Sequence, residues 1–568
     1  MSRSPKSAVL RNNQSQLAAK SASDAAWFGG LAPGALFVLT FVMCCFPLRD
    51  FDFWWHLRTG ELILERGTVP FADWYTYTDH DQPWIDMHWG FQVLIVGVYR
   101  SLGINGVILV KAALYTAAVI VGWKSAGRLL SRSRKVLIWL PAVIAITGRA
   151  YERPEMLSVL FLAIALFLAE QCRTQPKWIW AWPGLILVWA NCHALFILGI
   201  VVWCAVAGEA LVGRLTFFRK RPLARQWHSL AISHVIGCSV LIVLAAMMTP
   251  YGFDGLMFPW VLYRKFSTEN DFYSVRIGEF KAPIMFLQEL IRAHGLPGGL
   301  ILALKNLYFS AEIIVFLMGL ASFFAVFRTR QFRLSRLLLF IGFSHLAWVA
   351  TRNTSVFSLV SAVIASANFE DRDRVAHPGA TGRINEVPLW NQITTLGLGL
   401  LMVLFISGEW GHFVEKWKVF GLGEARHWFG HDAAKFCQRK GMPQRAFVAH
   451  IGLAGTWIYH NGPDKKVFMD PRLEVCTRAT FEKFDQVRAL MVQGQKEWEQ
   501  IINPDHAEMP VVILDNHFSR LQILALLQSS QWRLVFADPS AAVFLSAEQA
   551  ETLMLPPANP VVLTEILD

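Results

Sequence analysis

Two aspartates one residue apart, Asp50 and Asp52, begin a polar segment, and His56 follows Asp52 by four positions. Residues four apart lie one above the other on a helix face, so Asp52 and His56 can share a site. A positioned carboxylate can take a proton from an attacking hydroxyl group. The aspartates are therefore candidate catalytic bases, and His56 is a candidate substrate-binding residue. The alternative is structural, with Asp50 capping a helix whose first turn holds Asp52, and with His56 packing or hydrogen bonding.

Arginines could supply the complementary charge. Transfer of a group from a phosphate requires cations or a metal ion to stabilise the departing phosphate, and the arginine fork binds two of its oxygens. Arg149, Arg153 and Arg352 are candidates for this role. Alternatively, Arg149 pairs with Glu152 or Glu155, or these arginines bind ordinary lipid headgroups. A divalent cation such as Mg or Mn could serve the same purpose, and the sequence leaves the metal requirement open.

Three further polar residues could line a site. Asn191 and His193 could hydrogen-bond a sugar or a phosphate, or they could complete a tight turn between helices. Glu279 could provide a second carboxylate. All three are candidate substrate-binding residues.

The composition shows what must position these residues. Of the 568 residues, 54% are hydrophobic and only 17% are charged, against about a quarter charged in soluble proteins. The apolar residues form repeated long stretches, which indicates a polytopic membrane protein, and the 23 tryptophans suit its two interfaces with water. A net charge of +11 could suggest nucleic acid, but the basic residues lie in short loops between apolar stretches. We therefore expect no nucleic-acid partner.

Hydropathy predicts about eleven membrane-spanning helices. They lie near residues 27–46, 104–123, 136–148, 157–170, 178–190, 194–213, 229–248, 305–327, 337–350, 354–368 and 391–408. Basic residues gather in alternate connections, and the positive-inside rule places those connections in the cytoplasm. Both flanks of 178–213 are basic, so this segment must be a hairpin with 191–193 at its outer tip. The same argument makes 136–170 a hairpin that turns at 149–155.

This topology places the candidate site residues on the outer side. Residues 1–26 are predicted to be a cytoplasmic tail without an evident cleaved signal peptide. Residues 27–408 form the transmembrane domain, whose first outer loop covers 47–103. Within that loop, residues 51–65 and 84–102 have helical patterns. The first helix is expected to end before Gly67 and Pro70, which break helices.

The region 409–568 is predicted to be an extracytoplasmic α/β domain. We expect strands at 446–449, 466–469, 510–514, 532–537 and 542–545 and a helix at 520–527. This alternation favours a small mixed or parallel sheet. The region has no nucleotide-binding or hydrolase motif, so we expect it to bind or position an acceptor. Cys437 and Cys476 could pair in an oxidising compartment, which the sequence does not decide.

Four stretches together resemble the GT-C membrane glycosyltransferases, which include protein O-mannosyltransferases and lipid A aminoarabinose transferases. They are DFDFWWHLRTGELILERGTVPFADWYTYT at 50–78, VWANCHALFILG at 188–199, TPYGF at 249–253 and VFMDPRLEV at 467–475. The greatest similarity is to an uncharacterised bacterial branch. That branch often shows Glu-Trp where this chain has His88-Trp89, which puts a role for position 88 in doubt.

The resemblance implies an enzyme of the bacterial inner (plasma) membrane that transfers a sugar from a polyprenyl-phosphate donor. The acceptor would be a lipid, a glycan or a protein, and membrane lipids would surround the chain. In the wider family the acid of the first loop is the proposed base, which corresponds to Asp50 or Asp52 here. Some members need a divalent metal and others do not. The alternatives are a membrane transporter and a non-catalytic assembly protein.

Overall fold

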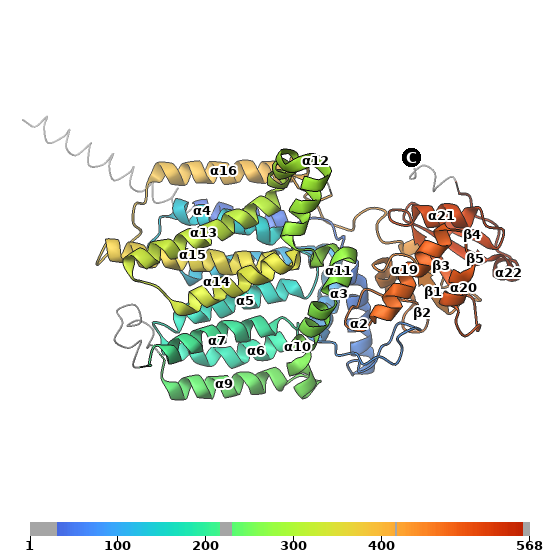
Figure 1. The fold of residues 1–568 in the computed structure, drawn as a ribbon, viewed down its shortest axis with the longest axis horizontal. Helices are drawn as coiled ribbons and strands as arrows, with labels where there is room; N and C mark the ends of the chain where they lie inside the picture. Colours follow the sequence, from blue (N-terminus) through green and yellow to red (C-terminus); the bar gives the residue numbers. More distant parts are fainter. Residues whose placement is uncertain (1–30, 216–229, 415–416, 561–568) are drawn as a thin grey trace, which may run out of the picture.

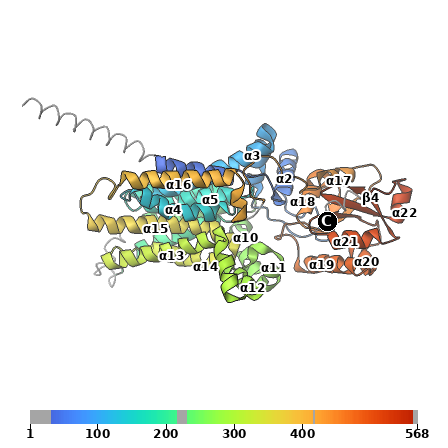
Figure 2. The ribbon, with the colours of Figure 1, turned by 90° about the horizontal axis from the view of Figure 1, so that it is seen from above.

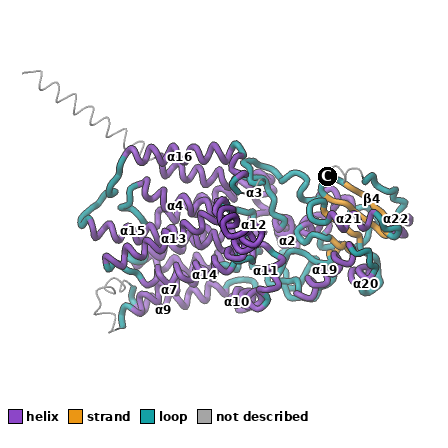
Figure 3. The backbone as a smooth tube through the Cα atoms, turned by 45° about the horizontal axis from the view of Figure 1, so that its top comes forward, coloured by secondary structure: helices purple, strands orange, loops and turns teal. Residues whose placement is uncertain are grey.

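The computed structural model describes residues 31–215, 230–414 and 417–560. Long helices lie side by side at one end of the molecule, and a small sheet flanked by shorter helices lies at the other (Figure 1, Figure 3). The predicted cytoplasmic tail, 1–26, falls outside the described residues.

Each predicted apolar segment contains a helix. The helices are Leu31–Cys44, α3 (Trp89–Ser125), α4 (Arg132–Thr147), α5 (Glu155–Gln171), η1 (Pro176–Ala181) with α6 (Trp182–Ala190), α7 (Phe196–Val212), α9 (Ile232–Met247), α13 (Leu307–Thr329), α14 (Leu334–Val349), α15 (Thr354–Ala376) and α16 (Pro388–Ile406). Both predicted hairpins are present, because α4 turns into α5 and α6 into α7 at the expected places.

Length and composition single out fewer of these helices as spans. Within the described ranges, α3, α13 and α16 are each long and apolar enough to cross a membrane. A fourth span is possible if α9 and α10 (Gly252–Thr268), which meet at a bend of 92°, count as one broken span. The helical membrane fold is therefore supported, while the number of spans stays a prediction.

The first outer loop contains the expected helices. Helix α2 (Asp52–Arg66) ends where Gly67 adopts a left-handed conformation, φ 65°. Helix α3 has a break at Gly103, φ 63°, which separates its outer part from its apolar part. The outer part begins at Trp89 and not at residue 84, because 84–88 form a turn. Figure 2 shows α2 and the start of α3 between the bundle and the sheet.

Residues 249–304, which lie between two predicted spans, form α10, α11 (Asn270–Arg276), η3 (Gly278–Phe280) and α12 (Pro283–Lys305). Helix α12 is broken at Gly295, φ 73°. Short helices interrupted by Gly and Pro have too little apolar periodicity to be recognised from sequence.

The C-terminal sheet is mixed, as predicted. Its order is β2-β1-β3-β5-β4, from β1 (Arg445–Val448), β2 (Lys466–Val467), β3 (Val511–Asp515), β4 (Trp532–Ala537) and β5 (Ala541–Ser546). Its helices are α17 (His431–Phe436), α18 (Leu453–Asn461), α19 (Arg478–Val492), α20 (Glu497–Ile502), α21 (Arg520–Leu527) and α22 (Ala547–Thr552). Cys437 and Cys476 are both free, and they belong to different hydrophobic clusters.

The first outer loop is joined to this sheet. The backbone N–H of Val467 donates to the carbonyl of Tyr75 at 2.9 Å, and the N–H of Tyr77 donates to the carbonyl of Val467 at 3.1 Å. Fully buried Arg472 forms ion pairs with Asp73 of the loop and with Asp470. Its charge is compensated on both sides, so the loop and the sheet are fixed to each other.

Candidate functional site

Three candidate carboxylates meet at one arginine. Arg153, in the turn between α4 and α5, pairs through Nε and Nη2 with both oxygens of Asp50. Its Nη2 also lies 3.1 Å from Asp52 Oδ2, and its Nη1 lies 2.8 Å from Glu279 Oε1. The three acids come from the start of α2 and from η3, and Arg153 lies 126 positions from Glu279. The fold therefore brings together candidate site residues that the sequence analysis identified separately.

Asp50 also has the capping role that was its structural alternative. Its Oδ1 accepts the backbone N–H of Asp52 at 2.9 Å, at the first turn of α2. The two roles are compatible because a carboxylate has several lone pairs. The cap fixes the side chain of Asp50 while Arg153 holds its other face.

The other two arginines lie beside this cluster. Arg149 Nη2 is 3.3 Å from Glu279 Oε2 and 3.9 Å from Glu155 Oε2, so one of its predicted pairings, with Glu155, is present. The guanidinium of Arg352 lies over the ring of Phe280, 4.9 Å from its centroid. Together with Arg153 they form a group of cations on the side that the topology predicts to be outer.

Glu152 has a different partner. Its Oε1 accepts a hydrogen bond of 2.6 Å from Lys111 Nζ of α3, and both side chains are fully buried. An ammonium deep in an apolar helix is costly unless it is paired. This pair explains the buried Lys111 and fixes the turn that carries Arg149 and Arg153.

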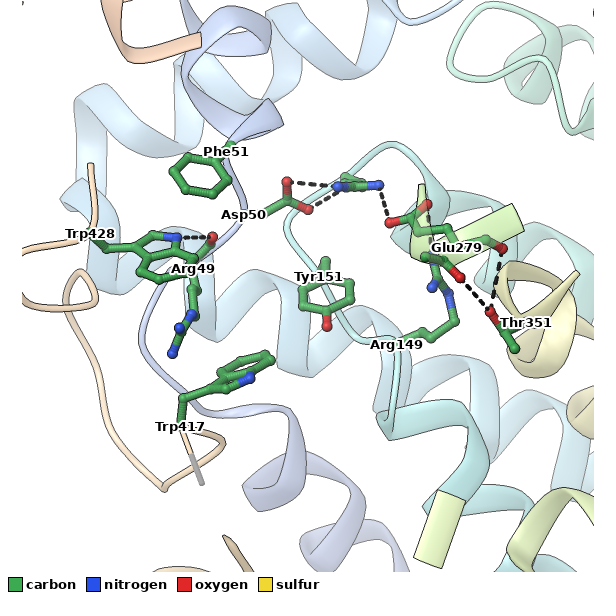
Figure 4. Close-up of a pocket in the computed structure, with 11 residues that line it drawn as sticks. Arg49, Asp50, Phe51, Arg149, Tyr151, Glu279, Thr351, Trp417 and Trp428 are labelled. Atoms are coloured by element: carbon green, nitrogen blue, oxygen red, sulfur yellow. Dashed lines mark hydrogen bonds and ion pairs between the residues drawn. The ribbon is translucent and has the colours of Figure 1, made fainter. Parts of the chain in front are cut away.

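A cavity of about 420 Å³ opens beside the ion pairs (Figure 4). Asp50, Arg149, Arg153 and Glu279 line one part of it. The other part is aromatic and includes Tyr151, Trp417, Trp428 and Phe51. Arg49, Gly278 and Thr351 complete the lining. The cavity thus offers ionic groups for a phosphate and flat rings against which an apolar sugar face can pack.

The aromatic wall was not predicted. Arg49 lies with its guanidinium 3.7 Å from the ring centroid of Trp428 and 4.8 Å from that of Trp417. Tyr151 stacks on Trp417 with centroids 6.2 Å apart. Arg49 adjoins Asp50 in sequence, which was a usable signal. Nothing in the spacing links the tryptophans to it, because they follow the last helix of the bundle.

The carboxylates differ in basicity. Burial raises the pKa of Asp52 to about 7, in opposition to Arg153 and with help from the charges of Asp50 and Glu279. Burial also acts on Glu279, but Arg153, Arg149 and Arg352 hold its pKa well below the usual range. Environments that separate the pKa values of neighbouring acids are typical of acid–base sites. Asp52 is therefore the better proton acceptor near neutral pH.

Three histidines form a row that begins at His56, one helical turn after Asp52 on α2. The ring centroids of His56 and His88 are 5.3 Å apart, as are those of His88 and His193. Hydrogen bonds join Nδ1 of His56 to Gln92 Nε2 at 3.3 Å and Nδ1 of His193 to Ser158 Oγ at 2.7 Å. Nδ1 of His88 has an ion-pair contact with Asp86 Oδ1 at 3.3 Å and, among the described residues, no hydrogen bond. Burial lowers the pKa of His56 and of His193, whereas Asp86 raises that of His88 against the effect of burial.

Asn191 holds the turn beside this row. Its Oδ1 accepts from Trp89 Nε1 at 3.2 Å, and its Nδ2 donates to the carbonyls of Leu187 and Met248. Its own carbonyl accepts the N–H of Gly90 at 2.9 Å, where a Cβ would come within 2.3 Å of that oxygen. The side-chain amide of Asn191 thus completes a turn, which was its structural alternative, and the turn places His193 beside His88.

Solved structures share the fold of this chain. The oligosaccharyltransferase AglB of the archaeon Archaeoglobus fulgidus, solved with an inhibitory peptide and a dolichol-phosphate, has a TM-score of 0.54 at 12% identity. The match covers 92% of this chain and 74% of that one. AglB solved with Zn and sulfate gives 0.53 at 12% identity and the same coverage. The chain has the GT-C fold. The fold expected from the motifs is therefore confirmed.

Other comparisons add little. ArnT from Cupriavidus metallidurans matches with a TM-score of 0.48 at 14% identity, over 92% of this chain and 98% of that one. No family model matches the sequence, and no curated protein is similar to it.

The presence of Zn with one GT-C structure raises the question of a metal here. In the part of the chain that the structure describes, no three His, Cys, Asp or Glu side chains are grouped so as to hold an ion. Asp50, Asp52 and Glu279 converge, but on the guanidinium of Arg153. This set of donor groups, already taken by a guanidinium, does not fit a divalent cation.

Proposed function

We propose that this protein is a membrane glycosyltransferase that moves a sugar from a polyprenyl-phosphate-linked donor to an acceptor at the outer face of the membrane. The observation that carries the proposal is the Asp50–Asp52 pair, held by Arg153 at the edge of a cavity in a GT-C fold. AglB, which shares the fold, was solved with a lipid phosphate and a peptide. Those two ligands support a donor and an acceptor of the same general kinds.

The residues divide the chemistry as follows. Asp52, whose pKa is raised to about 7 by burial, takes the proton of the acceptor nucleophile as the nucleophile's oxygen or nitrogen bonds to the anomeric carbon of the sugar. The bond from that carbon to the phosphate oxygen breaks, and the phosphate leaves with the electron pair. Arg149 and Arg352 stabilise its charge. Arg153 contributes charge and at most one free N–H, because four N–H directions already point to carboxylates.

The remaining candidates belong to the row of histidines and to the group of ion pairs. We propose that His56 and His193 face the acceptor and that Asn191 positions His193. Glu279 serves the donor side by orienting Arg149 and Arg153. In this proposal residues 1–26 are cytoplasmic, 27–408 form the membrane domain, and 409–568 lie outside the inner membrane of a bacterium.

The test is loss of the base. Asp52→Asn keeps the shape of the side chain, and we expect it to lower turnover on the order of 10²–10⁴-fold. In the assay, the purified protein is mixed with membrane lipid acceptors and with each of a panel of labelled polyprenyl-phosphate sugars. The release of polyprenyl phosphate is then measured. Asp81→Asn, whose side chain is 87% exposed in the same loop, is the matched control and should transfer at the parent rate. Equal rates for Asp52→Asn, Asp50→Asn and the parent would remove the proposed active site.

A further inference from the structure

We propose that Arg153 is the resident cation of this site, a tethered guanidinium that takes the place of a divalent metal among Asp50, Asp52 and Glu279. As far as it concerns the reaction, the inference rests on the proposed function. The position of the Arg153 guanidinium among the three acids does not depend on that function. The consequence is a transferase whose site needs no exchangeable ion.

The contacts leave no room for a metal among the acids. Arg153 takes both oxygens of Asp50 in a bidentate pair, with Nη2–Oδ1 at 3.1 Å. Its remaining contacts reach Asp52 at 3.1 Å and Glu279 at 2.8 Å. Three carboxylates around one centre would repel each other without a cation between them. The planar fork of arginine meets all three at once, and an ammonium could not do so with fixed geometry.

The guanidinium is held in place by the turn that bears it. Glu152, its neighbour in sequence, is tied to buried Lys111 at 2.6 Å. Pro154 follows and precedes α5, which begins at Glu155. Arg149, at the start of the same turn, contacts Glu279 at 3.3 Å and so braces the acid from its other oxygen. An ion entering this site would have to displace a cation that is covalently part of the fold and cannot diffuse away.

Removal of the guanidinium should expose the acids as ligands. Carboxylate oxygens are the ligands that Mn²⁺ and Mg²⁺ prefer. Arg153→Ala would leave three of them around the position of the lost guanidinium, where rotation of their side chains would bring them together on one ion. We therefore expect this variant to bind one Mn²⁺ ion at least roughly tenfold more tightly than the parent protein, which is about 1.4 kcal/mol.

The experiment is Mn²⁺ titration of the purified full-length chain in detergent, read from the electron paramagnetic resonance of free Mn²⁺. The parent should show no site that depends on Asp50, and Arg153→Ala should gain one. The double variant Arg153→Ala with Asp50→Asn should lose it again. The matched control is Arg276→Ala, which removes an outer arginine paired with the single acid Asp485 at 2.6 Å and should gain nothing.

Two results would overturn the inference. One is a Mn²⁺ site in the parent protein that disappears in Asp50→Asn. The other is sugar transfer by the parent that stops with EDTA and returns with Mn²⁺. If Arg153→Ala does not fold, Arg153→Gln replaces it. The Mn²⁺ titration and the EDTA test of the parent protein decide the question without either variant. If the parent moves no sugar under any condition, the proposed function fails, while the Mn²⁺ titrations still report where the cation resides.

Discussion

At the scale of single residues, the site depends on how burial and neighbouring charges give similar acids different pKa values. Asp52 and Glu279 both contact Arg153, yet their pKa values shift in opposite directions. Burial raises the pKa of Asp52, whereas the neighbouring arginines lower that of Glu279. Sequence could name Asp50 and Asp52 as a pair. It could not rank the basicity of Asp52 against that of Glu279, because this ranking comes from burial and from arginines that are distant in the sequence.

The pH dependence of transfer follows from this ranking. Asp52 must be ionised to accept a proton, so kcat/KM should rise with pH through about 7, the raised pKa of Asp52. Glu279→Gln removes a negative charge that helps to raise this pKa, and it leaves Arg153 more available to Asp52. The rising limb should therefore move to lower pH. Initial rates between about pH 5 and 9 measure it, and a limb that stays or moves to higher pH would exclude Asp52 as the base.

At the scale of elements, the start of α2 is wedged against the C-terminal domain. A Cβ on Gly455 would lie 2.6 Å from the carbonyl oxygen of Phe51, and one on Gly452 would lie 2.6 Å from the ring of Phe51. The ring of Phe51 also stacks on Trp428 at 5.1 Å. Phe51 lies between the two aspartates, so the packing of α18 controls where they point.

Gly455→Ala tests this contact. The added methyl must displace Phe51, at a cost of about 1–3 kcal/mol for overpacking. Because small misplacements of reacting groups are expensive, transfer should fall by up to about 10²-fold. Gly97→Ala in α3 is the control, since no atom lies within 4 Å of its Cβ. Thermal unfolding and transfer rates are compared, and an active Gly455→Ala protein would mean that α18 does not position the pair.

The turn between α4 and α5 depends on a buried charge pair. Lys111→Met should leave Glu152 buried without a partner, and this should cost about 3–5 kcal/mol of stability. Adding Glu152→Leu should recover most of the loss, because an apolar pair needs no compensation. The unfolding midpoint in detergent measures both, with Lys124→Met at the exposed end of α3 as the control. If the Lys111→Met protein were as stable as the parent, the pair would not hold the turn.

At the scale of the whole molecule, hydropathy and periodicity predicted most of the elements. The bundle helices, α2 and all five strands lie close to where the sequence placed them. The helices of 249–304 were missed because Pro259, Gly295 and Pro297 interrupt them. The aromatic wall was missed for another reason. Trp417 and Trp428 reach Arg49 only after the chain has crossed the entire bundle, and such long-range contacts leave no local pattern.

The predicted orientation can be tested with exposed positions at the two ends of the molecule. A cysteine replacing Ala376, the last residue of α15, should react only with membrane-permeant reagents. A cysteine replacing Ser530, between α21 and β4, should react with impermeant ones. The charge asymmetry of the connections is the physical reason. The native cysteines give the background, and the reverse pattern would place the cavity in the cytoplasm.

The backbone pairing of Tyr75 and Tyr77 with Val467 limits how such a protein can be changed by recombination. The segment before α3 completes an edge of the distant sheet, and Arg472 is neutralised by an acid of that same segment. A chimaera that exchanged only the C-terminal domain would remove both contacts at once, leaving an unpaired strand edge and an Arg472 that keeps Asp470 but loses its second acid. Any functional graft between relatives must therefore carry the loop and the domain together, as one inherited module split in sequence by the whole membrane bundle.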